Sequence, residues 1–273
     1  MAAANPVFGS VVALWRYPVK SMQGEELNAS EVTERGLVGD RAFALVDAAD
    51  GKVASAKNPR KWPHLFDFRA AFTAAPRPGQ LPPVRITLPS GASLTSEQGD
   101  RDELLSAALG RTISLHGAAP ERPVLEEYWP DLEGLPHRDA VTDEALPQGT
   151  FFDLGTVHLL TTATLDRLRS LYPAGRFEPR RFRPNIIVAT GPEAAGFVEN
   201  DWVGRTVRIG DTVHLRVVIP TGRCVMTTLP QFDLPKDSGI LRTAAQHNNA
   251  AVGVYAQVLA GGSIRRGDVV TVL

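Results

Sequence analysis

The single cysteine of the chain, Cys224, lies in the segment Thr221-Gly222-Arg223-Cys224. An apolar run over 213–219 and a short turn precede it, so we expect the cysteine at the end of a β-strand. By position alone, a lone cysteine is more often a small buried apolar residue than a functional one. Arg223 favours a thiolate, although neighbouring side chains of an extended strand point to opposite faces and its guanidinium can act on another group. A thiolate here would suit a metal already bound by soft sulfur.

Two further segments could contact an anionic or polar ligand. One is the run from Arg176 to Asn185, in which four arginines stand around two prolines that stiffen the backbone. Arginine grips phosphate through paired hydrogen bonds, although a solvated loop is the commoner outcome for a basic run. The other is Tyr17-Pro18-Val19-Lys20-Ser21, which supplies a cation and a hydroxyl. Gly39-Asp40-Arg41 would by itself pass as a turn with a surface ion pair.

Charge and cysteine content exclude several kinds of protein. The chain has 29 basic and 30 acidic residues, so we expect a small-molecule partner, with no binding to nucleic acid or to a membrane. One cysteine excludes an intrachain disulfide, a four-cysteine zinc site and a cysteine-ligated iron-sulfur cluster in this chain. The six histidines share no metal-ligand spacing. No signal peptide or apolar stretch of roughly 20 residues is apparent, and a cytoplasmic location is expected.

Short apolar or alternating runs separated by turns predict a mainly β (α+β) protein with barrel or sandwich architecture. Before residue 120, strands are expected at 11–15, 42–46, 84–88 and 112–115, with a small helix after the capping-box pattern of 100–103. After residue 150, a strand at 157–161 and a helix over 165–172 precede strands at 185–189, 207–209, 213–219, 252–258 and 269–273. The proline-rich, acidic segment 121–148 suits a connection over the surface. This divides the chain into domains 1–120 and 121–273, with a linker over about 121–150.

The cysteine and the two basic segments together resemble the MOSC family, specifically its molybdenum-cofactor enzymes: the bacterial YcbX-like proteins and the mitochondrial amidoxime-reducing component. The resemblance covers nearly the whole chain and implies an N-terminal MOSC-associated β-barrel domain followed by a β-barrel MOSC domain with a few short helices. It rests on motifs that occur in the expected order: Tyr17-Pro18-Val19-Lys20-Ser21, Gly36-Leu37-Val38-Gly39-Asp40-Arg41, Leu159-Leu160-Thr161-Thr162, Arg181-Phe182-Arg183-Pro184-Asn185, Asp201-Trp202, Gly204, Ile209-Gly210-Asp211 and Arg223-Cys224.

In that family the cysteine of the arginine-cysteine motif ligates molybdenum beside the two dithiolene sulfurs of the pterin, which implies Cys224 as metal ligand and catalytic residue. Asp153 matches an acidic residue of the family near the cofactor and is the second catalytic candidate. The resemblance implies cofactor contacts from both parts of the chain, and we expect the cofactor in a cleft between them. The implied contacts are Lys20, Ser21, Arg41, Thr161, Thr162, Arg183, Asn185, Thr221 and Arg223.

The implied reaction is the two-electron reduction of an N-hydroxylated compound, such as an amidoxime or hydroxylamine, with the oxygen leaving as water. Some bacterial relatives add a C-terminal ferredoxin-like domain, whereas this chain stops at Leu273 with no spare cysteine. Electrons are therefore expected from a separate donor protein of the ferredoxin, flavoprotein or cytochrome type. The Thr221-Gly222 pair also differs from the serine form of the mitochondrial enzymes.

Two other functions remain open on the sequence. The same domain occurs at the C-terminus of molybdenum-cofactor sulfurases, so the chain could be a non-catalytic carrier of cofactor or sulfur in which Cys224 is an acceptor. Purified protein that holds molybdenum but reduces no N-hydroxylated substrate would favour this carrier. The second alternative is a cofactor-free β-barrel binding protein in which Cys224 only packs. That function would not explain why Arg183, Asn185 and Arg223 match the family pattern.

Overall fold

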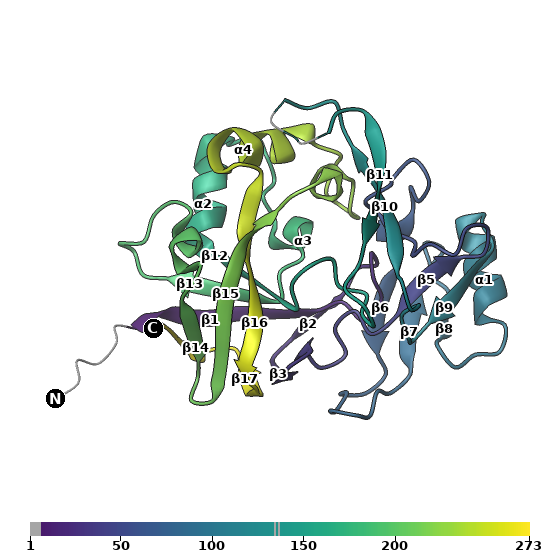
Figure 1. Ribbon diagram of the computed structural model, residues 1–273, viewed down its shortest axis with the longest axis horizontal. Coiled ribbons are helices and arrows are strands. Elements are labelled where there is room, and N and C mark those ends of the chain that lie inside the picture. The colour runs from purple at the N-terminus through teal and green to yellow at the C-terminus, as the bar shows by residue number, and fades with distance from the viewer. Residues whose placement is uncertain (1–6, 134, 136) are drawn as a thin grey trace.

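A seven-stranded closed barrel is the largest unit of the computed structural model, which describes residues 7–133, 135 and 137–273 (Figure 1). The strands follow the order β13-β12-β16-β15-β14-β18-β1, and the antiparallel pairing of β1 with β13 closes the ring. A further strand, β2, extends the sheet beside β1. Their bounds are β1 (Val7–Arg16), β2 (Glu25–Leu27), β12 (Val157–Thr161), β13 (Ile186–Thr190), β14 (Thr206–Ile209), β15 (Val213–Gly222), β16 (Ala251–Ala260) and β18 (Val269–Val272). The predicted mainly β fold class is confirmed.

Alternating side chains explain why these segments form a barrel. In β15, Val213, Leu215 and Val217 are fully buried, whereas the residues between them face outward. Burying such a side chain contributes roughly 1.5–3 kcal/mol. Bulges between Val217 and Ile219 and between Pro220 and Gly222 interrupt this alternation, so that Ile219 is exposed while Thr221 is again buried near the strand end. The strand therefore delivers the segment after it, which contains Cys224, to one end of the barrel.

The barrel combines strands from both predicted domains. β1, from the beginning of the chain, pairs with β18 and with β13 from the second part. Leu14 of β1 and Val11 belong to the same buried cluster as the inward side chains of β14, β15 and β16. The division at about 121–150 remains a prediction about sequence units, and the largest sheet of the structure crosses it.

A second hydrophobic core lies under the smaller sheets of the first part. One sheet joins β5 to β9, and another has the order β6-β7-β8. A third, β17-β3-β4, borrows a strand from the C-terminal region and packs Val32, Leu37 and Ile264 into the barrel core instead. Large side chains such as Phe68, Trp62 and Leu65 fill the second core. The bounds are β3 (Ala29–Thr33), β4 (Gly36–Leu37), β5 (Ala44–Asp47), η1 (Leu65–Asp67), β6 (Arg69–Phe72), β7 (Val84–Thr87), β8 (Ser93–Thr95), α1 (Arg101–Leu109), β9 (Ile113–His116) and β17 (Gly262–Arg265).

The segment interpreted as a surface connection, 121–148, instead contains a β-hairpin, and that part of the secondary-structure prediction was wrong. β10 (Val124–Trp129) pairs with β11 (Ala140–Ala145) over six residues. Leu125 and Glu127 are buried at alternate positions of β10. The alternation was hidden because one of the two inward residues is a carboxylate.

Four α-helices and three short 3-10 helices complete the part of the chain that the structure describes. Figure 1 shows α2, α3 and α4 on the same side of the barrel. The remaining bounds are α2 (Thr162–Leu171), α3 (Pro179–Phe182), η2 (Val198–Trp202), η3 (Val225–Thr228) and α4 (Ser238–Asn248). None of the described helices is long and apolar enough to cross a membrane.

Candidate functional site

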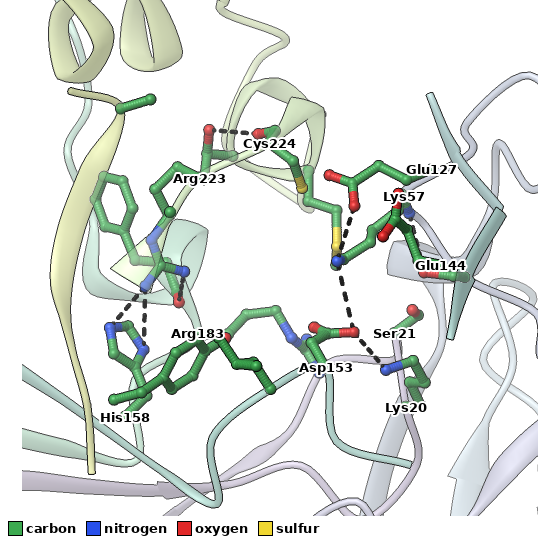
Figure 2. Close-up of a pocket in the computed structure, with 18 of the residues that line it drawn as sticks. Lys20, Ser21, Lys57, Glu127, Glu144, Asp153, His158, Arg183, Arg223 and Cys224 are labelled. Atoms are coloured by element: carbon green, nitrogen blue, oxygen red, sulfur yellow. Dashed lines mark hydrogen bonds and ion pairs between the residues drawn. The ribbon is translucent and has the colours of Figure 1, made fainter. Parts of the chain in front are cut away.

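A cavity of about 540 Å³ lies where the barrel end, α3, η3 and the β10–β11 hairpin meet (Figure 2). Residues from both parts of the chain line it, as expected for a cleft between them. The side chains that matter for its chemistry are Lys20, Ser21, Arg41, Lys57, Glu127, Trp129, Glu144, Asp153, His158, Arg181, Arg183, Arg223, Cys224, Met226 and Tyr255. Of the eleven site residues named from the sequence, seven line this cavity: Lys20, Ser21, Arg41, Asp153, Arg183, Arg223 and Cys224.

Cys224 lies directly after β15 and before η3, partly exposed in the cavity. Its carbonyl oxygen accepts hydrogen bonds from the backbone amide and the hydroxyl of Thr227, which fixes the turn. Burial, reinforced by the Glu127 carboxylate, raises the pKa of the Cys224 thiol to about 12. The thiol alone is therefore protonated at neutral pH, and a bound metal would be needed to hold the thiolate.

Arg223 points away from Cys224 and acts on other groups, which is the second of the two possibilities that the sequence left open. Its Nη2 lies 2.7 Å from His158 Nε2, and its Nη1 donates to the carbonyl of Phe182. Burial and the Arg223 charge hold the pKa of His158 well below its usual range, so His158 is neutral and its Nε2 can accept. Gly253 makes room for this pair, because it has φ +80° and a Cβ there would lie 2.3 Å from His158 Nε2.

Two guanidinium groups lie close to the ring of Tyr17. Arg41 lies 4.6 Å and Arg183 4.1 Å from its centroid, and the ring itself is buried. Arg183 Nη1 donates to the carbonyl of Met22 at 2.7 Å. Burial and the nearby Arg41 lower the pKa of Arg183 to about 10, so both arginines stay charged at neutral pH.

Asn185 holds this arrangement from behind the cavity. Its Nδ2 donates to Asp40 Oδ2 at 2.9 Å, and its Oδ1 accepts from the backbone amide of His158 at 3.0 Å. Asp40 in turn pairs with Arg41 and accepts from the amide of Tyr17. The structure thus places Asn185 where it orients cavity residues and not on the cavity surface.

An alternating row of charges crosses the cavity floor towards the hairpin (Figure 2). Lys20 Nζ lies 2.7 Å from Asp153 Oδ1, Lys57 Nζ lies 3.7 Å from the same oxygen, and Lys57 Nζ lies 3.0 Å from Glu127 Oε2. Burial works to raise the pKa of Asp153, but Lys20 and Lys57 hold it well below its usual range. Burial lowers the pKa of Lys20 to about 8, against the opposing pull of Asp153.

The backbone around the cavity is held in an unfavourable conformation. Seven of the described non-glycine residues have positive φ, and five of them line the cavity: Ser21, Arg41, Arg183, Asn249 and Ala250, with φ between 47° and 63°. Each such residue costs on the order of 1–3 kcal/mol, and this kind of strain gathers at functional sites. The clustering supports a binding role for this cavity independently of its charges.

Comparison with known proteins identifies the family of the chain. The model of the MOSC N-terminal beta barrel domain matches residues 8–115, and the model of the MOSC domain matches residues 149–271. The chain belongs to the MOSC family.

Mitochondrial amidoxime reducing component 2 of Rattus norvegicus is 26% identical over 95% of this chain and 82% of its own length. Mitochondrial amidoxime-reducing component 1 of Homo sapiens is 25% identical over 81% of this chain and 66% of its own length. The YUAD protein of Bacillus subtilis aligns with 97% of this chain and 94% of its own, at 11% identity and a TM-score of 0.48.

Three threonines that the MOSC resemblance named lie away from the cavity surface. Thr161 begins α2, where its Oγ1 accepts from the amide of Thr164 and donates to the buried carboxylate of Glu199. Thr162 lines a separate hollow with Thr190. Thr221 is fully buried, and its hydroxyl has no hydrogen-bond partner among the described residues.

Several residues of the MOSC cavity were missed by the sequence reasoning. His158 was interpreted as an ordinary histidine, although a polar residue inside the buried strand Val157–Thr161 is an exception that calls for a partner. Glu127, Trp129 and Glu144 reach the cavity only because the hairpin folds over it. Lys57, from the segment between β5 and η1, and Tyr255, from β16, were also missed, since no local pattern marks them.

The lining side chains fit a polar, anionic ligand. Six of those described are cations and three are carboxylates, so the wall carries an excess of positive charge. The cations come from several elements and converge on one space, and Cys224 is the single thiol among the described residues that line it. This donor set suits a phosphate-bearing pterin whose metal takes one protein thiolate.

Proposed function

We propose that this protein binds the molybdenum cofactor and reduces small N-hydroxylated compounds by two electrons. The observation that carries the proposal is the convergence of Cys224 with Arg41, Arg183 and Lys20 on one cavity. Family membership and the distant similarity to amidoxime-reducing components support the same assignment. Electrons would come from a separate donor protein, because no described side chains other than Cys224 offer a thiolate for a redox centre.

Different residues would bind different parts of the cofactor. Lys20, Arg41 and Arg183 would bind its phosphate and polar ring edges, and Cys224 would ligate the metal. Once bound, the cofactor supplies two electrons and an acceptor for oxygen. The overall change is R-NHOH plus two electrons and two protons giving R-NH₂ and water, in which the N–O bond breaks.

The protein itself would orient and shield the reactants. Arg223, fixed by neutral His158, would add its positive charge to the barrel side of the cavity wall. Asp153 stays ionised between two lysines, so it would balance the cationic wall and fix the ammonium groups for ligand contact. The β10–β11 hairpin covers the opposite side and limits the entry of water.

The first experiment compares wild type with Cys224→Ser. We expect wild type to contain molybdenum and phosphorus in about equal amounts and to reduce benzamidoxime with an artificial electron donor. Cys224→Ser should keep its phosphorus, because the cations that hold the phosphate are unchanged, and should lose the thiolate-to-metal absorption and at least about 99% of turnover.

A second variant separates metal ligation from cofactor retention. Arg183→Gln should lose phosphorus and molybdenum together, because it removes a cation of the cradle and leaves Cys224 intact. A Cys224→Ser protein with the reductase activity of wild type would refute the assignment. Wild type that holds molybdenum but reduces no N-hydroxylated substrate with any donor would instead identify a carrier.

A further inference from the structure

The β10–β11 hairpin gives the cavity a wall of different chemistry from the barrel side. Trp129 from β10 and Glu144 from β11 line it, together with Glu127. Figure 2 shows Glu127 and Glu144 across the cavity from Arg223 and His158. Arg223 and His158 therefore line one side of the cavity, and the other side combines carboxylates and an indole ring with Lys57.

Glu144 differs from the other two carboxylates of the cavity, each of which forms an ion pair with a lysine. Glu127 pairs with Lys57 and Asp153 pairs with Lys20. Glu144 forms no ion pair with any residue that the structure describes, although its side chain is half-buried in the cavity wall. A partly desolvated carboxylate without a counter-charge raises the energy of the empty protein and is ready to accept a cation.

A chain of hydrogen bonds fixes the indole and the carboxylate relative to each other. Trp129 Nε1 donates to Thr142 Oγ1 at 2.8 Å, and Thr142 Oγ1 donates to Glu144 Oε1 at 2.8 Å. All three residues lie on the paired strands of the hairpin, whose register is continuous over six residue pairs. Both recognition groups are thus pre-positioned, so that little side-chain conformational entropy is lost when a ligand binds.

We propose that Trp129 and Glu144 form a subsite for a flat cationic nitrogen base of the amidinium or guanidinium class. A planar cation stacks on the indole face and pairs with a carboxylate through two parallel N–H donors. The catalytic role of this subsite rests on the proposed reductase function. Reduction of an amidoxime gives an amidine, which is a stronger base and is cationic at neutral pH. The subsite then binds the amidine product in its cationic form, and among substrates it selects N-hydroxyguanidines, which are cationic near neutral pH, over neutral or acidic N-hydroxy compounds.

The test measures equilibrium binding to the purified holoprotein by calorimetry, with three probes of nearly the same shape: benzamidine, benzamide and benzoate. Wild type should bind benzamidine at least about tenfold more tightly than benzamide and should show no binding of benzoate at the wall. Glu144→Gln, which keeps shape and removes charge, should bring benzamidine and benzamide within about twofold of each other. Trp129→Leu should weaken benzamidine binding by a similar factor.

Asp143→Asn is the matched control, since Asp143 is the next residue along β11, is exposed, and pairs with Lys52 at 2.6 Å outside the cavity. It removes the same charge and should keep the wild-type preference. In turnover, Glu144→Gln should raise the KM of a basic N-hydroxyguanidine about tenfold and leave that of a neutral oxime unchanged.

Binding and turnover distinguish the two proposals. Equal affinity of wild type for benzamidine and benzamide, or an unchanged preference in Glu144→Gln, overturns the subsite even if amidoximes are reduced. A preference that Glu144→Gln abolishes and Asp143→Asn retains supports the subsite, even in a protein that reduces nothing.

Discussion

Tyr17 shows how single side chains prepare this cavity for an anion. Two guanidinium groups near one buried ring would repel each other, but each is attracted to the π system of that ring. Asp40 and the carbonyl of Met22 hold them from behind. The positive groups are therefore in place before any ligand arrives, which reduces the ordering that binding requires.

Lys20 should make anion binding depend on pH. Its pKa of about 8 in the folded protein lies below that of a free lysine, so the ammonium is lost as the pH rises through this value. An anionic ligand favours the ammonium, so binding takes up a proton in this range and weakens at higher pH. After dialysis, wild type should retain less phosphorus per chain at about pH 9.5 than at about pH 7. Lys20→Arg should show no such difference, because arginine stays charged; an equal decline in both would place the titrating group elsewhere.

At the scale of elements, β16 must pass very close to β12 for the site to form. Gly253 permits this approach, since a Cβ there would meet both His158 Nε2 at 2.3 Å and the carbonyl of Leu159 at 2.5 Å. The space that a Cβ would fill is occupied by the neutral imidazole of His158, which contacts Arg223. The distance between two strands thus sets the position of a cavity guanidinium.

Gly253→Ala should therefore destabilise the fold and disturb the cavity together. We expect a loss of about 2–4 kcal/mol in the free energy of unfolding, from backbone strain and overpacking combined, measured by denaturant titration. Gly204→Ala is the control, because Gly204 has nearly the same φ, +82°, and nothing within 4 Å of its Cβ position. It should lose only about 1 kcal/mol. Equal losses in the two variants would mean that the close approach contributes nothing.

Elements with one buried face could be predicted from the sequence, because alternation in segments such as 213–219 reports burial directly. The hairpin could not, since the inward Glu127 is charged and its partner Lys57 is distant in the sequence. The family resemblance supplied Arg183 and Cys224, but not their surroundings. His158, Trp129 and Glu144 enter the cavity through pairing between strands, which no local pattern encodes.

At the scale of the whole molecule, the barrel is completed by a strand from the far end of the sequence. β1 stands between β13 and β18, and without it both would become open edges. The inward side of β1 also supplies Leu14 and Val11 to the barrel core. The second predicted domain thus depends on the first strand of the chain.

A fragment of residues 121–273 should accordingly fail to fold alone. We expect no cooperative thermal transition in circular dichroism, because the open barrel exposes its core and two strand edges. Joining residues 7–28 to its N-terminus through a flexible linker should restore a cooperative transition. A fragment without β1 that unfolds as sharply as the full chain, at a similar temperature, would contradict this dependence.

The pairing of β1 with β18 also determines when, during synthesis of the chain, the barrel can close. A ribosome adds roughly 5–20 residues per second, so the last barrel strand emerges on the order of 10–50 s after the first. Throughout that interval the nascent chain carries an incomplete sheet, which chaperones would have to shield. The cavity walls that rest on the closed ring form only after β18 has emerged, so a ligand of this cavity would bind after that point of synthesis and not before it.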